Sequence, residues 1–173
     1  MKSKPTLRQS IVLSMIGAMM FASTFAMKGL PNIHLLAFFI IVSTRVYRAG
    51  ALIPIYIYVI GEGVYEGFGL FWLPNLYIWT VLWVLVMLLP EKLPKKLEPI
   101  IYCLFGGLHG IAFGALWAPA NALLMHLNFS QSVAWVIAGL PFDALHAAGN
   151  IVSCLLCVPV IALMKRLEQK SVR

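Results

Sequence analysis

The stretch GLPFDALHAAGN, residues 139–150, decides how the last third of this chain is divided into helices. Gly139 and Pro141 are expected to begin a new helix, because proline suits the first helical position. An unbroken helix over residues 130–164 would be about 52 Å long, too long for one bilayer. The stretch also places Asp143, His146 and Asn150 where a lipid-facing helix would carry leucine.

The composition of the whole chain is that of a membrane protein. Of its 173 residues, 61% are hydrophobic and 11% are charged, and the mean hydropathy is +0.90. Soluble domains carry about 25% charged residues. We therefore predict an all-α integral membrane protein, and the length fits a single membrane domain over residues 1–173.

The apolar runs predict a six-transmembrane-helix bundle, since a bilayer crossing needs about 20 apolar residues. The second run is short, and Pro54 and several glycines interrupt the third. Residues 130–138 are expected to form a short surface helix or a cap. The first run could also be a signal peptide, but it is longer than the usual apolar region of about 7–15 residues. The expected spans are approximately residues 9–27, 30–47, 51–68, 73–89, 99–124 and 141–164.

Lysine and arginine predict the orientation of this bundle, because they collect in cytoplasmic loops. Of the 13 basic residues, only Lys28 falls on the other side of the expected membrane. Both termini are therefore expected in the cytoplasm, and the net charge of +7 reflects topology, with no nucleic acid as a partner. The residues on the cytoplasmic side are Lys2, Lys4, Arg8, Arg45, Arg48, Lys92, Lys95, Lys96, Lys165, Arg166, Lys170 and Arg173.

Polar side chains follow one stripe of the last span. Asp143, His146 and Asn150 are spaced i, i+3 and i+7, which places them on one helical face. Polar groups at such depth are functional candidates by default. The alternatives are a capping role for Asp143 and interhelical hydrogen bonds for the other two. His109 could face the same cavity or bond to a neighbouring helix.

Further polar and aromatic residues gather on the expected outer side. Glu62 and Glu66 are four residues apart and share a helix face. Together these side chains predict a pocket that is open to the outside and binds a polar, ring-bearing small molecule. The candidate substrate-binding residues are Asn32, His34, Glu62, Glu66, Trp72, Asn75, Trp79, His109, Asp143, His146 and Asn150.

We predict no catalytic residue, no metal ligand and no cofactor for this chain. The sequence G-x-x-x-x-G-K-[ST] of nucleotide-binding loops is absent, so any ATPase must be another chain. The cysteines Cys103, Cys154 and Cys157 lie in apolar runs without metal-binding spacing, and we interpret them as small core residues.

A strip of small residues marks the first span. Ala18, Ala22 and Ala26 repeat every fourth residue among bulky methionine and phenylalanine side chains. Such spacing allows close helix approach in lipid, so we predict a partner-docking face.

These features together resemble the S-components of energy-coupling factor (ECF) transporters, the substrate-specific subunits for vitamins and related micronutrients. The alanine strip resembles the family's AxxxA docking motif, and GLPFDALHAAGN resembles the start of its pocket-lining sixth helix. LPNIHLLAFF (residues 30–39) and FWLPNLYIWTVLW (residues 71–83) resemble the first loop and fourth helix of uncharacterised members. The resemblance implies a binding subunit of the bacterial plasma membrane that joins a transmembrane T-subunit and two cytoplasmic ATPases. It implies no catalysis, and the ligand stays open.

Two alternatives remain. An intramembrane metalloprotease of the CAAX-processing type is suggested by FGGLH (residues 105–109) and HAAGN (residues 146–150). Two histidines and a glutamate could hold zinc with an open position, but the E-E-x-x-x-R motif of that family is absent. The second alternative is a structural membrane subunit without a ligand, and the polar stripe argues against it.

Overall fold

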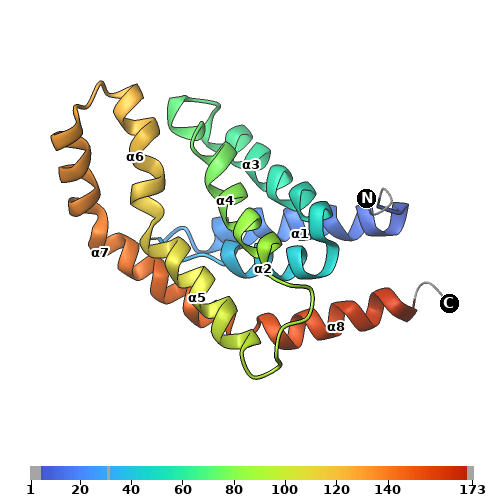
Figure 1. The fold of residues 1–173 in the computed structure, drawn as a ribbon. Helices are drawn as coiled ribbons and strands as arrows, with labels where there is room; N and C mark the ends of the chain where they lie inside the picture. Colours follow the sequence, from blue (N-terminus) through green and yellow to red (C-terminus); the bar gives the residue numbers. More distant parts are fainter. Residues whose placement is uncertain (1–4, 31, 171–173) are drawn as a thin grey trace.

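The structure, a computed structural model, describes residues 5–30 and 32–170, and these residues form helices joined by turns and loops (Figure 1). No strand occurs in this part of the chain, which confirms the all-α class. Two short 3-10 helices, Arg48–Ala51 and Leu70–Trp72, precede α3 and α4. The α-helices are α1 (Leu7–Ala26), α2 (Leu36–Tyr47), α3 (Leu52–Glu66), α4 (Asn75–Leu88), α5 (Glu98–Ile111), α6 (Phe113–Leu124), α7 (Phe129–Cys154) and α8 (Cys157–Lys170).

Several helical runs have the length and composition of membrane spans, as in a multi-pass membrane protein. Within the described residues there are five such runs. One of them holds both α2 and α3, which a turn at Arg48 (φ 54°) separates. Because the 12 residues of α2 extend only about 18 Å, the six-span count stays a prediction. The five runs are Leu7–Ala26, Leu36–Glu66, Leu70–Leu88, Glu98–Leu124 and Phe129–Cys154.

The predicted break at Gly139 and Pro141 is wrong. Helix α7 continues through both residues and ends at Cys154 (Figure 1). A proline removes one backbone N–H and bends a helix, but membrane helices tolerate it where neighbouring groups satisfy the freed carbonyl. The chain breaks instead at residues 155–156, just before Pro159, whose missing N–H and ring disfavour helical structure at Leu155. The expected span over residues 141–164 is therefore shared between α7 and α8.

Other boundaries also differ from the expected spans. Helix α2 begins at Leu36, and the residues before it form a loop in which Asn32 has φ 56°. Pro54 does not interrupt α3, because it lies in the first turn, where the N–H groups have no intrahelical partner. The expected fifth span is divided at Ala112 into α5 and α6.

Glycines let the helices that form the interior approach closely. On α5 and α6, Gly106, Gly110 and Gly114 repeat every fourth residue and face α7. A Cβ atom at Gly110 would lie 2.6 Å from the backbone of Ala147. The polar stripe of α7 consequently lies directly against α5 and the start of α6.

Polar contacts join α1, α2 and α8 at the end of the molecule where α1 begins and α8 ends (Figure 1). The Glu168 carboxylate of α8 accepts hydrogen bonds from Gln9 of α1 and Tyr47 of α2, each at 3.0 Å. Arg45 is buried and donates to the Tyr102 hydroxyl and to the carbonyls of residues 90 and 91. The basic residue that we interpreted as a topology signal thus also ties α2 to the connection between α4 and α5.

Candidate functional site

Three of the four histidines of the chain meet in the interior. The ring centroid of His146 lies 4.5 Å from that of His34, 4.7 Å from Phe113 and 6.3 Å from His109. The Trp79 ring lies 5.5 Å from His34 and 5.6 Å from His109. We call these five residues the histidine cluster. They come from the first loop, α4, α5, α6 and α7, so residues far apart in the sequence form one centre.

The stripe of α7 supplies the deepest polar groups of this centre. Asp143, His146 and Asn150 are all buried, with exposed fractions of 3%, 0% and 0%. Each lies beside one of the three glycines of α5 and α6 that face α7, in the order Gly114, Gly110 and Gly106. The Asn150 amide donates to the Gly106 carbonyl at 3.0 Å. The backbone of α7 at His146 and Ala147 packs directly against Gly110.

Asp143 has a structural partner that differs from the expected one. It lies in the middle of α7 and does not cap the start of its own helix. Its carboxylate accepts a hydrogen bond at 3.1 Å from the backbone N–H of Gly114, in the first turn of α6. A carboxylate at a helix N-terminus satisfies an otherwise unpaired donor and interacts well with the helix dipole. This contact accounts for the burial of Asp143 without a ligand.

Several buried polar atoms of the centre have no hydrogen-bond partner among the described residues. Buried polar groups are normally paired, and one left unpaired costs about 1–3 kcal/mol. His146 contributes both ring nitrogens to this set. The unpartnered atoms in and beside the cluster are His34 Nδ1, His109 Nδ1, Trp117 Nε1, His146 Nδ1, His146 Nε2 and Asn150 Oδ1. These atoms are therefore the candidates for contact with a ligand.

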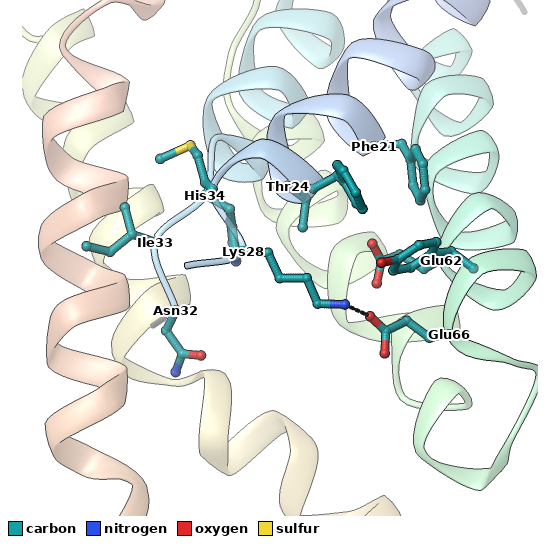
Figure 2. Close-up of a pocket in the computed structure, with 11 residues that line it drawn as sticks. Phe21, Thr24, Lys28, Asn32, Ile33, His34, Glu62 and Glu66 are labelled. Atoms are coloured by element: carbon teal, nitrogen blue, oxygen red, sulfur yellow. Dashed lines mark hydrogen bonds and ion pairs between the residues drawn. The ribbon is translucent and has the colours of Figure 1, made fainter. Parts of the chain in front are cut away.

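A pocket of about 220 Å³ opens beside the cluster, between the end of α1, the first loop and the end of α3. Four of the candidate substrate-binding residues line it, and the other seven do not: the four are Asn32, His34, Glu62 and Glu66. Figure 2 shows Lys28 reaching across the pocket to Glu66, with which it forms an ion pair. The hydrogen bond from Lys28 to Glu66 raises the pKa of this lysine above its ordinary value.

His34 belongs to both the pocket and the cluster. It lines the pocket, and its ring contacts His146 and Trp79. Burial, together with the positive charge that His109 would carry if protonated, lowers the pKa of His34 from 6.5 to about 4. This histidine is therefore neutral at neutral pH and separates the open pocket from the buried atoms.

Two of the predicted residues play supporting parts. Trp72 donates from its indole N–H to the Val59 carbonyl at 2.7 Å and takes no part in the cluster. The Asn75 side-chain oxygen accepts from the Trp79 indole at 3.1 Å and so orients the tryptophan ring. Their expected role in ligand contact stays a prediction, as it does for the other candidates.

The described part of the chain contains no group of three histidine, cysteine or acidic side chains arranged to hold a metal ion. His109 and His146 approach each other, as the protease alternative requires, but no glutamate joins them there. The cysteines are free: Cys154 and Cys157 are buried, and Cys103 is half-buried.

A second surface lies on the outer face of α1. Ala18, Ala22 and Ala26 are all exposed, while Leu13 and Met20 face the interior. The alanine strip is thus exposed on the surface of the helix bundle.

Several members of the site were not among the residues predicted from the sequence. The glycine strip had a signal in the spacing G-x-x-x-G-x-x-x-G over residues 106–114. Lys28 had a signal as the one basic residue on the expected outer side. Trp117 had a signal as one of the aromatic residues on the expected outer side. Phe113 had none, because a phenylalanine in an apolar run does not indicate which residues it contacts. Compared with models of protein families, with curated proteins and with solved structures, the chain matches none of them.

Proposed function

We propose that this chain is the substrate-binding subunit of a membrane uptake system for a vitamin or related micronutrient, of the kind represented by ECF S-components. The observation that carries the proposal is the set of unpartnered buried polar atoms of the histidine cluster, next to a pocket at one end of the bundle. A small polar ligand that pairs with these atoms removes the cost of leaving them unpaired. No reacting group is needed for this role, and the chain is not proposed to be an enzyme.

The position of the basic side chains at one end of the helix bundle supports an outward-facing pocket. The turn after α2, the connection between α4 and α5 and the end of α8 meet at the end opposite the pocket, where basic side chains gather. Under the positive-inside rule that end is cytoplasmic. In a bacterial plasma membrane the pocket would then face outward, with both termini inside, and the ligand would enter past the first loop.

The exposed alanine strip supports the second half of the role. Binding alone does not move a solute, and the chain carries no nucleotide-binding loop. Uphill uptake would therefore use a T-subunit docked on Ala18, Ala22 and Ala26 and two cytoplasmic ATPases attached to it. The metalloprotease alternative has less support, because no carboxylate completes a metal site with His109 and His146 in the described residues. A purely structural subunit would not need unpaired buried atoms.

Mass spectrometry of small molecules that co-purify with the protein tests the binding role. We expect a stoichiometric organic ligand in the wild-type protein and in His126→Asn, which removes the exposed histidine outside the cluster. In His146→Leu the affinity for that ligand should fall by about tenfold to a hundredfold, the equivalent of one or two lost hydrogen bonds. Equal ligand content and affinity in all three proteins would refute a binding role of the cluster.

A further inference from the structure

The hydrogen bonds of the cluster determine which of its atoms can accept from a ligand. His109 Nε2 lies 3.1 Å from the Ile78 carbonyl oxygen. A carbonyl oxygen only accepts, so Nε2 carries the hydrogen and donates. His109 is buried without a carboxylate partner, and a buried unpaired charge is costly, so the ring is neutral. The unpartnered Nδ1 is therefore an acceptor.

The stripe of α7 adds two acceptors and one donor. The Asn150 amide nitrogen donates to the Gly106 carbonyl, which leaves the unpartnered Oδ1 as an acceptor. A neutral His146 offers one donor and one acceptor, and neither has a partner. At the edge of the cluster the indole N–H of Trp117 is a further donor, with its ring 6.4 Å from Phe113. A matching ligand must therefore donate several hydrogen bonds and accept one or two.

The charge of the ligand follows from the same atoms. A carboxylate or phosphate brings acceptors only, which would face the lone pairs of His109 and Asn150. A cation would need an unpaired carboxylate to repay its desolvation, and none of the five residues of the histidine cluster carries one. The cluster contains no lysine or arginine. These groups favour an uncharged ligand.

The shape of the ligand follows from the aromatic walls. The residues of the cluster contact one another through the edges and faces of their rings. The ring plane of His146 makes an angle of 73° with that of His34 and 74° with that of Phe113. The ring planes of Trp79 and His109 make an angle of 37°. These rings already contact one another, so a ligand must displace at least one of them, and a flat ring restores the edge-to-face contacts that are lost. The adjacent pocket of about 220 Å³ is smaller than the roughly 300–1,000 Å³ of typical ligand sites. His34 is the cluster residue that lines this pocket, so a ligand that reaches the buried atoms from there must displace it.

We infer that the ligand of the histidine cluster is an uncharged, flat nitrogen heterocycle that carries amino or ring N–H groups. The inference rests on the proposed binding function. Amino-substituted heterocycles combine N–H donors with ring-nitrogen acceptors in one plane, which is the pattern that His109, His146 and Asn150 require. A site built to pair with such groups discriminates strongly against analogues that lack them.

Binding of small probe rings to the purified protein tests this class. The probes are 2-aminopyrimidine, its methyl analogue 2-methylpyrimidine, and the aromatic anion nicotinate, measured by ligand-observed NMR titration at neutral pH. We expect 2-aminopyrimidine to bind at least about tenfold more tightly than either of the other probes, which is the discrimination that one additional hydrogen bond provides. His146→Phe, which keeps a ring and removes both nitrogens, should abolish this preference, and His126→Asn should retain it.

The outcomes separate the ligand class from the binding function. Equal or tighter binding of nicotinate or 2-methylpyrimidine would overturn the class. If His146→Phe nevertheless abolished that binding, the cluster would remain a binding site and the proposed function would stand. Binding of none of the probes would likewise overturn the class, and the co-purified ligand would then decide the function independently.

Discussion

At the scale of single residues, the polar side chains of α7 divide into one with a structural partner and two with unsatisfied atoms. Asp143 accepts from the Gly114 backbone, whereas His146 and the Asn150 side-chain oxygen have no hydrogen-bond partner among the described residues. The stripe that looks uniform in sequence therefore contains two kinds of residue. Asp143 orders the start of α6, and the other two are the residues that we propose for ligand contact.

Substitution of Asp143 tests its role in ordering the start of α6. Asp143→Leu removes the acceptor of the Gly114 N–H, and we expect it to lower the free energy of unfolding by about 0.5–2 kcal/mol, as for a lost helix cap. Asp143→Asn keeps a side-chain oxygen in place and should lose clearly less. Thermal unfolding of the purified proteins measures both. Equal stability of wild type and Asp143→Leu would show that the contact does not hold α6.

His34 predicts a pH dependence of stability. Its pKa is lowered from 6.5 to about 4 in the folded protein, so the unfolded chain binds the proton more tightly between these values. The stabilisation is complete above pH 6.5 and is lost as the pH falls towards 4. We expect the melting temperature of the wild type to decrease over this range and that of His34→Gln to decrease less. Parallel curves for the two proteins would contradict the assignment to His34.

At the scale of helices, the glycine strip controls the approach of α7 to α5. Gly110→Ala would place a Cβ atom 2.6 Å from the Ala147 backbone, so the helices must separate. Gly139 in α7 has no atom within 4 Å of such a Cβ. Gly139→Ala should therefore stabilise the protein by up to about 1 kcal/mol through helix propensity, and Gly110→Ala should destabilise it. Melting curves of the two variants check this, and the same sign for both would refute the close packing.

The outer face of α1 makes a second prediction at this scale. Ala22→Trp places a large ring on the exposed alanine strip without touching the interior. We expect ligand binding to persist, while co-purification with the T-subunit and cellular uptake are lost. Ala134→Trp is the matched control, because Ala134 is exposed on α7 away from the strip. Normal uptake with Ala22→Trp would remove the docking face from the proposal.

At the scale of the whole molecule, the position of the basic residues predicts the sidedness of the membrane domain. Single cysteines at Asn128 and at Lys95, in a protein whose three native cysteines are replaced, report on opposite ends of the bundle. Under the positive-inside rule, a membrane-impermeant thiol reagent added outside should label position 128 and not position 95. The reverse labelling would invert the topology and place the pocket on the cytoplasmic side.

Much of the fold could be predicted from one-dimensional patterns. Helix formation depends on local hydrogen bonds and on runs of apolar residues, so the all-α class and helices close to residues 9–27 and 73–89 followed from the sequence. The burial of Asp143, His146 and Asn150 on one face of α7 followed from helical periodicity.

Only the tertiary structure decided where the helices break and which side chains meet. Pro141 and Pro159 look alike in sequence, yet α7 passes through the first and ends before the second. His34, His109 and His146 are separated by tens of residues. Their sequence context made each a candidate for one outer pocket, but only the structure shows His34 and His109 beside His146. Their meeting depends on the close approach that Gly106, Gly110 and Gly114 permit, which is a property of packed surfaces and not of any single helix.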